Sequence, residues 1–154
     1  MKFDIKTLKF WKDNLVNHSS VGGIVYDDSK RVCMLFHKNM NRWTIPVGHI
    51  DKGERPGDAL DRELEEEIGI KVISKKKIIV KKMKFFFNSK EIEIAMHIYE
   101  IEDYKGTPKN KEPHQHKIMK FFTVSELINM PREDISEFTW LWLYNLKGNF
   151  NMKF

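Results

Sequence analysis

The sequence predicts an α/β fold in which a mixed central β-sheet carries one helix on a face and a second helix follows near the C-terminal end. Two observations predict this class. Residues 56–68 have the amphipathic spacing of a helix and lie between a proline and a glycine. Runs of β-branched and aromatic residues occur both before and after this stretch, so strands are expected on both sides of the helix in the chain.

Length and composition indicate one globular domain. The 154 residues are expected to form a single domain, residues 1–154, with a core over about 19–146. No apolar run reaches the ~18 residues of a membrane span, and the N-terminal stretch lacks the apolar segment of a signal peptide. The single cysteine, Cys33, excludes an internal disulfide and is expected to be a buried strand residue. We expect a cytoplasmic protein without a membrane partner, in the host cytoplasm if the source is viral.

The segment before the helix reads as short strands and turns. Residues 3–16 alternate charged and bulky side chains, and both a helix and an edge strand stay open for them. A strand, a turn, a second strand, a loop and a short strand are then expected over residues 19–27, 27–30, 31–37, 38–42 and 43–47. The first two of these strands are expected to pair as a hairpin.

The central helix has clear start and stop signals. Pro56 suits the first helical turn, where its missing N–H is not needed. Gly69 suits the left-handed residue just past a helix end, so the helix is expected from about Pro56 to Ile68. Leu60, Leu64 and Ile68 form an apolar stripe that is expected to pack on the sheet.

The second half of the chain continues the pattern. One or two strands, a turn, a strand, a polar loop, a strand, a helical turn and a closing helix are expected over residues 71–87, 88–90, 91–101, 103–115, 116–124, 125–130 and 131–146. Ser125 is expected to cap the helical turn, and Pro131 to open the closing helix. The aromatic residues of that closing helix are expected to pack in the core.

Three carboxylates share one face of the central helix. Each residue advances by about 100°, so Glu63, Glu66 and Glu67 lie side by side. Seven acidic residues from Glu54 to Glu67 face two arginines, and each like-charged pair costs about 0.2–0.5 kcal/mol. A bound Mg²⁺ or Mn²⁺ reverses that cost, because both ions prefer carboxylate oxygens. A solvated acidic helix is the alternative that these charges alone leave open.

The spacing of residues 48–70 is more specific than their charge. The segment reads Gly48, five residues, Glu54, seven residues, Arg62-Glu63-Leu64, one residue, Glu66-Glu67, one residue, Gly69-Ile70. This pattern resembles the Nudix box at every defined position, and the chain is identified by it as a member of the Nudix hydrolase family. The resemblance implies a Nudix-like α/β/α sandwich, a Mg²⁺ or Mn²⁺ cofactor, and hydrolysis of a nucleoside diphosphate linked to another moiety.

The resemblance also implies roles for the charged residues of the box. Glu66 and Glu67 are the implied main metal ligands, and Glu63 is an implied ligand or general base. Arg62 is implied to orient Glu54 by a charge-assisted hydrogen bond, a task that suits a planar guanidinium better than a lysine. The catalytic set predicted from the box is therefore Glu54, Arg62, Glu63 and Glu66.

Metal ligands are also expected outside the helix. In relatives the backbone carbonyl just before the box glycine binds metal, and Val47 holds that position here. Relatives commonly carry a glycine there, so Val47 leaves this loop less free to bend. A glutamate or histidine on a late loop often completes the site, and Glu112 is the candidate for metal, with Glu126 less favoured.

Candidates for substrate binding are less specific. They comprise residues near the start of the box, a small residue on the helix, aromatic side chains able to stack on a base, and two late histidines: Gly48, His49, Ala59, Trp43, Phe86, His114 and His116. Core packing or an exposed loop position explains most of these residue types equally well.

The substrate is narrowed mainly by exclusion. Markers that resemble those of ADP-ribose, dinucleoside polyphosphate, coenzyme A and NADH hydrolases are absent. The compact form that remains is similar to nucleoside triphosphate pyrophosphatases, which release a nucleoside monophosphate and pyrophosphate. An RNA 5′-end pyrophosphohydrolase or decapping enzyme is the alternative, favoured by the net charge of +5 and by the lysines of 71–90. A non-catalytic nucleotide-sensing module is the alternative of another class.

Overall fold

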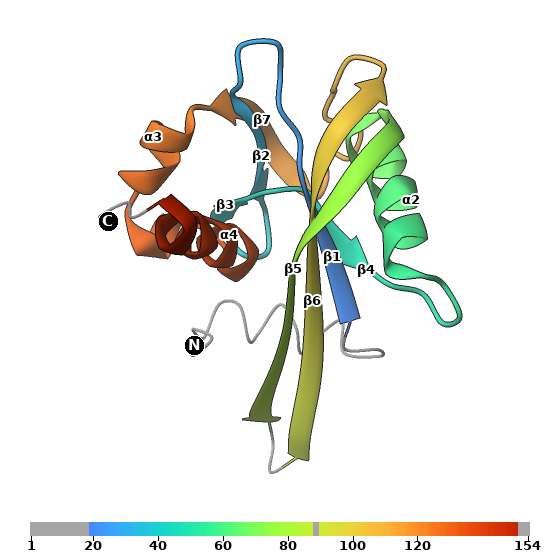
Figure 1. Ribbon diagram of the computed structural model, residues 1–154, viewed down its shortest axis with the longest axis vertical. Coiled ribbons are helices and arrows are strands. Elements are labelled where there is room, and N and C mark those ends of the chain that lie inside the picture. Colours follow the sequence, from blue (N-terminus) through green and yellow to red (C-terminus); the bar gives the residue numbers. More distant parts are fainter. Residues whose placement is uncertain (1–18, 88–89, 151–154) are drawn as a thin grey trace.

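The computed structural model describes residues 19–87 and 90–150, with side chains described there except over 83–92, 94 and 147–150. In chain order the elements are β1 (Ser19–Ile24), β2 (Val32–His37), β3 (Arg42–Thr44), β4 (Val47–His49), α2 (Pro56–Ile68), β5 (Lys71–Phe87), β6 (Lys90–Lys105), β7 (His116–Phe122), α3 (Val124–Ile128), η1 (Arg132–Asp134) and α4 (Glu137–Phe150). Figure 1 shows α2 on one side of the strands and α3 with α4 on the other. Within the described residues, none of the helices has the length and apolar character needed to span a bilayer.

The strands form two sheets. One has four strands in the order β4-β1-β6-β5, and the other has three in the order β3-β2-β7. In the larger sheet β1 pairs parallel with β6 and antiparallel with β4, and β5 pairs antiparallel with β6. The predicted α/β class with a mixed sheet between helices is therefore confirmed, and the separate three-stranded sheet is an addition to the prediction.

The hairpin expected from β1 and β2 is wrong, although its turn is present. In the turn over 27–30, Asp27 Oδ1 accepts a hydrogen bond of 2.9 Å from the Arg31 N–H. Next to the turn the two segments do pair, through the bridge between Tyr26 and Val32 and the backbone hydrogen bonds from Asp27 N–H to the Arg31 carbonyl and from Cys33 N–H to the Val25 carbonyl. Farther from the turn the two strands diverge into different sheets. The cause is that β4 and β6 already occupy both edges of β1, so no edge is left for β2.

The short strand expected over 43–47 is divided between the two sheets. It becomes β3 and β4, with Ile45 and Pro46 between them. The Ile45 N–H donates to Thr139 Oγ1 at 3.0 Å, and the Pro46 carbonyl accepts from the Gly23 N–H at 3.0 Å. The chain crosses here from the three-stranded to the four-stranded sheet, which brings the start of the box to a sheet edge.

Helix α2 has the predicted bounds. Pro56 is its first residue, and Gly69 ends it with φ of 71°, where the Gly69 N–H donates to the Glu65 carbonyl at 3.1 Å. The buried side chains of α2 are Ala59, Leu60, Leu64, Glu67 and Ile68. The predicted apolar stripe thus faces the core, and one carboxylate is buried with it.

The short helix α3 is capped differently from the prediction. Thr123, and not Ser125, is the cap: Thr123 Oγ1 accepts from the Glu126 N–H at 3.1 Å, and Glu126 Oε1 accepts from the Thr123 N–H at 2.9 Å. This reciprocal capping box starts the helix one residue before Ser125. The cap on Ser125 was wrong because the strand β7 ends earlier than expected. Glu126 is held in this cap and is not among the residues that line the cavity between α2 and β4.

The closing helix begins at Glu137 and not at Pro131. A short 3-10 turn follows Pro131, and the chain is then extended at Ile135. Ser136 Oγ accepts from the Thr139 N–H at 3.3 Å, which caps α4 at its actual start. The expected core packing of the helix aromatics holds for Phe138 and Trp142, which are 3 % and 1 % exposed. It is wrong for Tyr144, which is 57 % exposed and stacks on the Trp140 ring at 5.1 Å.

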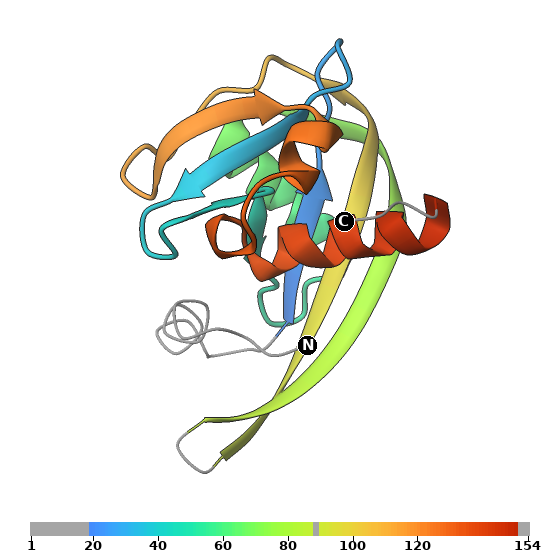
Figure 2. The ribbon, with the colours of Figure 1, turned by 90° about the vertical axis from the view of Figure 1, so that its left-hand side faces the viewer.

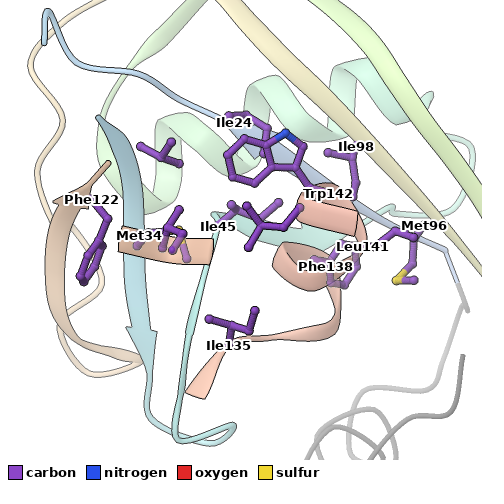
Figure 3. Packing of buried hydrophobic residues seen from close by; sticks show 13 residues of the cluster. Ile24, Met34, Ile45, Met96, Ile98, Phe122, Ile135, Phe138, Leu141 and Trp142 are labelled. Atoms are coloured by element: carbon purple, nitrogen blue, oxygen red, sulfur yellow. The ribbon is translucent and has the colours of Figure 1, made fainter. Parts of the chain in front are cut away.

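Two apolar clusters cover the two faces of the four-stranded sheet. Along β1 the side chains alternate, so Ile24 belongs to the cluster with α4 while Val21 and Val25 belong to the cluster with α2. Figure 3 shows the first cluster, in which the Trp142 indole lies between Ile24 and Ile98. Each such large apolar side chain contributes about 1.5–3 kcal/mol on burial, so the clusters fix both helices against the sheet.

The segment over 71–87, for which one or two strands were open, is one long strand. β5 and β6 pair from Lys71 opposite Lys105 to Phe87 opposite Lys90 and form a continuous hairpin. The expected turn at 88–90 falls mostly outside the described residues, as does the open assignment for 3–16.

His37 and His116 form a buried pair. Their ring centroids are 5.4 Å apart, and the residues are 5 % and 2 % exposed. Burial first, and a neighbouring histidine second, lowers the pKa of each imidazole to about 4.

This pair predicts a pH dependence of stability. On unfolding, both histidines return to a pKa of about 6.5, so the unfolded chain binds more protons between pH ~6.5 and ~4. The free energy of unfolding should therefore fall by about 2 kcal/mol per histidine between pH 7 and 5. Urea unfolding of the wild type and of His116→Gln at both pH values measures it. Buried carboxyls with raised pKa act with the opposite sign, so the difference between the two proteins isolates the histidine. An identical pH dependence in both proteins would contradict the prediction.

Candidate active site

A cavity of about 340 Å³ lies between α2 and the β4 edge of the four-stranded sheet. Its lining comprises carboxylates of α2 and of the loop before β7, residues of β4, and side chains from β1, the β2 end and α4: Glu63, Glu66, Glu67, Glu112, Gln115, Val47, Gly48, His49, Ser20, His37, Asn39 and Phe138. The structure thus brings the three box carboxylates together on one wall, with a fourth from the late loop.

Arg62 makes the largest group of hydrogen bonds described within the box. Its Nε and Nη2 donate to the two carboxylate oxygens of Glu54 at 3.0 and 2.9 Å, a two-bond arrangement that holds Glu54 rigidly. Nη2 also donates to the His49 carbonyl at 3.0 Å. Nη1 donates to Glu63 at 2.9 Å and to Glu66 at 3.4 Å. One guanidinium therefore ties the loop after β4 to the carboxylate face of α2.

The pKa values of these carboxylates shift in different directions because their environments differ. The hydrogen bonds from Arg62 hold the pKa of Glu54 below its usual value. Burial raises the pKa of Glu63, and this effect outweighs the attraction of Arg62. Glu67 is 4 % exposed, and burial first, then the charges of Glu63 and Glu112, raises its pKa well above the ordinary range. The wall of the cavity is therefore short of positive charge despite Arg62.

Gly48 lets α2 approach β4 closely. A Cβ atom built at Gly48 would lie 2.1 Å from Glu63 Cδ and 2.3 Å from Glu63 Cγ, well inside any real contact distance. The glycine therefore leaves space for the Glu63 carboxylate at the cavity wall, where Arg62 holds it. The need for a glycine at this position is steric, since its φ is not in the left-handed region.

The late loop is fastened to the C-terminal end of α2. The Lys111 N–H donates to the Glu67 carbonyl at 3.0 Å, and the Lys109 N–H donates to the Ile68 carbonyl at 2.9 Å. These bonds satisfy helix-end carbonyls that have no partner within the helix. They also carry Glu112 to the cavity, where it joins the wall formed by α2.

The opposite wall was not predicted from the sequence. Ser20, His37, Asn39, Gln115 and Phe138 come from separate elements and share no spacing pattern. Phe138 was expected only to pack, and it does pack in the α4 cluster while also lining the cavity. Because these residues meet only through the tertiary fold, no local sequence signal identifies them.

Two substrate candidates lie away from the cavity. Trp43 packs edge-on against Phe36 and Phe122, with ring centroids 5.3 and 4.9 Å apart, on the three-stranded sheet. Ala59 is fully buried in the cluster under α2, because it continues the apolar stripe and not the carboxylate face. Neither residue lines the cavity.

The late histidines and Phe86 are also not placed at the cavity. His114 is exposed and is not among the lining residues, and His116 is buried against His37. The Phe86 side chain lies outside the described residues, although its backbone belongs to β5. Gly48 and His49 are the substrate candidates that line the cavity.

The donor set fits a hard divalent cation. In the described part of the chain no three His, Cys, Asp or Glu side chains already have the spacing of a formed metal site, and Glu63 is paired with Arg62. Yet Glu67 Oε2 is buried without a hydrogen-bond partner among the described residues, which is costly unless something charged or polar reaches it. Carboxylate oxygens are the ligands that Mg²⁺ and Mn²⁺ prefer, so the cluster suits such an ion.

The family follows from comparison of the whole chain. The model of the NUDIX domain family matches residues 16–143, which is most of the chain. The chain therefore belongs to the Nudix family, in agreement with the box at 48–70 and with the fold.

Individual relatives are more distant. The chain is 40 % identical over 52 residues to the RNA pyrophosphohydrolase of Ruthia magnifica, which covers 34 % of this chain and 29 % of that protein. It is 35 % identical over 78 residues to the RNA pyrophosphohydrolase of Bartonella henselae, covering 45 % of this chain and 43 % of that protein. These matches span less than half the length of either relative. A MutT NUDIX hydrolase from Burkholderia pseudomallei has a similar structure, with a TM-score of 0.71 and 22 % identity over 84 % of this chain and 97 % of that chain.

The close contact at Gly48 predicts a coupling between two residues. Gly48→Ala should lower the free energy of unfolding by about 1–3 kcal/mol, because the added methyl group meets the Glu63 side chain. Glu63→Ala in the same chain should restore most of that loss, because it removes the atoms that clash. A double-mutant cycle by urea unfolding measures the coupling. Strictly additive effects would show that Glu63 does not occupy the position described.

Proposed function

We propose that this protein is a Mg²⁺- or Mn²⁺-dependent pyrophosphohydrolase that cleaves a nucleoside triphosphate into a nucleoside monophosphate and pyrophosphate. The observation that carries this proposal is the convergence of Glu63, Glu66, Glu67 and Glu112 on one cavity, with Glu67 buried and one of its oxygens unsatisfied. Membership of the Nudix family supports the proposal.

Some residues at the cavity would bind the metal, and others hold those residues in position. The carboxylates of Glu66, Glu67 and Glu112, together with the Val47 carbonyl, would hold the metal, and Glu63 would act either as a further ligand or as the general base. When bound, the metal neutralises phosphate charge and lowers the pKa of a bound water. These are the two requirements for splitting a pyrophosphate linkage at neutral pH.

Arg62 and Glu54 act through position. Arg62 fixes the loop after β4 through the His49 carbonyl and Glu54, so the loop keeps its place while phosphates enter and leave. The same guanidinium holds Glu63 at the cavity wall, where its carboxylate is placed to accept a proton from water. This supports Glu63 as the general base, with Glu66 and Glu112 as alternatives at the same wall.

The lining of the cavity favours recognition of phosphates over recognition of a particular base. Phe138 is the aromatic side chain in the lining formed by the described residues, and most other lining residues are polar. A nucleobase that is recognised tightly is usually stacked on aromatic rings and hydrogen-bonded at its edges. We therefore propose broad activity on nucleoside triphosphates, with the polyphosphate as the shared recognition element.

RNA with a 5′-triphosphate is the second candidate substrate. Two observations favour it: the partial relatives named RNA pyrophosphohydrolase, and the net charge of +5 with lysines concentrated at 71–90. Positive charge attracts a nucleic acid through its phosphates whatever the sequence. The same cavity and the same carboxylates would serve both substrates.

Substitution of Glu67 tests the metal site. Glu67→Gln should lower kcat at least about 100-fold, because a neutral amide cannot replace a carboxylate ligand. Mg²⁺ at about 100 times its Kd should raise the Tm of the wild type by about 5–10 °C, and this increase should disappear in Glu67→Gln. Glu65→Gln, an exposed glutamate on the same helix outside the lining, is the matched control and should behave as wild type. Wild-type turnover in Glu67→Gln would refute the site.

A substrate panel separates the candidate functions. It comprises dNTPs, oxidised dGTP, ADP-ribose, dinucleoside polyphosphates, and triphosphorylated or capped RNA, with products identified by mass. Nucleoside triphosphates should give the monophosphate and pyrophosphate with little preference among bases. Preferred hydrolysis of RNA would establish the second candidate, and tight nucleotide binding without any turnover would indicate a sensing module.

A further inference from the structure

The β5–β6 hairpin extends beyond the sheet at the end where the cavity lies. β1 pairs with β6 only from Ala95 to Glu100, so the pairs from Met83–Ile94 to the tip run past the start of β1. Figures 1 and 2 show this arm projecting from the body of the molecule. Among the described strands β5 forms one edge of the sheet, and β4 with the cavity forms the other.

The strand register connects the two edges. Lys81 pairs with Met96, Met96 with Ser20, and Ser20 with His49, so these four residues form one row across the sheet. Ser20 and His49 line the cavity. With neighbouring strands about 4.8 Å apart, Lys81 lies about 10 Å along the sheet from Ser20 and about 14 Å from His49. Lys82 lies one residue further toward the projecting end.

Some lysines of β5 lie next to an acidic residue, and others do not. Lys75 is paired with Asp61 at 3.0 Å, and Lys76 lies opposite Glu100 in the pairing with β6. The remaining exposed lysines of the described part of β5 near the cavity end face no acid on β6. They are Lys77, Lys81 and Lys82, which lie opposite Tyr99, Met96 and Ala95, and we call them the basic edge.

The positive field of the basic edge reaches its neighbours. Burial first, and then the charges of Lys77 and Lys82, lowers the pKa of His97 on the adjacent strand. Lys77 also lies over the Tyr99 ring at 5.5 Å, which holds its ammonium group in place on the strand. No ion pair among the described residues neutralises these three lysines, so they are available to an external anion.

A free nucleotide bound in the cavity is too small to contact the basic edge. All phosphates of a nucleoside triphosphate belong to the 5′ group that the carboxylate cavity would receive. Only a nucleic-acid chain carries further phosphates that continue beyond the cavity. Ser20 and Met96 in the row between His49 and Lys81 are buried, so a chain with its 5′ end in the cavity would reach Lys81 and Lys82 past the start of β1, where the hairpin projects.

We propose that the basic edge binds the phosphate backbone of an RNA strand whose 5′-triphosphate occupies the carboxylate cavity. This inference rests on the second candidate of the proposed function and deepens it. The lysines are point charges, and the exposed side chain between them on the strand is Val80, 48 % exposed. The contacts are therefore with phosphates and not with bases, so binding is independent of RNA sequence and sensitive to salt.

The test compares two triple substitutions of equal charge. Lys77→Gln/Lys81→Gln/Lys82→Gln removes the basic edge. Lys71→Gln/Lys105→Gln/Lys117→Gln is the matched control, because its lysines are exposed and two of them pair at the opposite end of the same hairpin. Binding of a fluorescent 20-nucleotide RNA with a 5′-hydroxyl, measured by anisotropy across a salt series, reports the surface without any hydrolysis.

The basic-edge variant should lose affinity for this RNA at least about fivefold at low salt. Its slope of log affinity against log salt should fall by about 2, since each single-strand phosphate contact contributes about 0.7. Its kcat/KM should fall at least about fivefold on triphosphorylated RNA and stay within about twofold of wild type on free nucleoside triphosphates. The control variant should stay within about twofold of wild type in all three measurements.

Several results would overturn the inference. Equal losses in both triple variants would show an effect of net charge alone. Losses on free nucleotides as large as those on RNA would show a disturbed cavity. Unchanged RNA binding with loss of binding to anionic phospholipid vesicles would assign the edge to a membrane. Unchanged RNA binding with aggregation of the variant would show that the lysines only protect an open strand edge.

If the triple variant does not fold, Lys81→Gln and Lys82→Gln alone should each lower the salt slope by about 0.7.

Failure of this inference is distinct from failure of the proposed function. A wild type that hydrolyses free nucleotides and binds no RNA refutes the basic edge and leaves the pyrophosphohydrolase intact. A wild type that hydrolyses neither substrate, yet binds RNA through the three lysines, supports the basic edge and refutes the proposed activity.

Discussion

Repulsion among the carboxylates of α2 is the constraint on which the site depends. Three of them, Glu63, Glu66 and Glu67, converge with Glu112 of the late loop. One guanidinium supplies the nearby positive charge through its bonds to Glu54, Glu63 and Glu66. The hydrogen bonds of Arg62 reach Glu54, Glu63 and Glu66, whereas Glu67 is more deeply buried. Repulsion among these carboxylates therefore destabilises the folded chain, and a cation bound at the cavity wall would remove that repulsion. The site lowers the stability of the fold and in return can bind a cation.

The rest of the fold holds this unfavourable cluster in place. The apolar stripe of α2 packs under the sheet, so the helix cannot rotate its carboxylates toward solvent without exposing Leu60 and Leu64. Gly48 sets how close the helix lies to β4, and the crossing at Pro46 brings β4 to the sheet edge. The late loop closes the far end by bonding to the last carbonyls of α2. Local turns and long-range packing thus act on the same few side chains.

The parts of the fold and of the candidate site that depend on a short stretch of sequence were predictable. The bounds of α2, the grouping of its three glutamates and the Gly69 end follow from helical period and turn chemistry within a short segment. The partition of the strands into two sheets did not follow, because pairing depends on which edges remain free. The same limit applies to the site: the box identified one wall, whereas His37 and Phe138 reach the other through contacts that are distant in sequence. Trp43 shows the converse, since an aromatic residue near the box packs in the fold.

Crystals grown with Mn²⁺ and measured by anomalous diffraction test the central claim most directly. A strong manganese peak within coordination distance of the Glu67 carboxylate, bounded by Glu63 and Glu66, is the predicted result. A peak at another place on the surface, or none at saturating Mn²⁺ with the cavity accessible, would contradict the claim that these carboxylates are gathered to hold a cation.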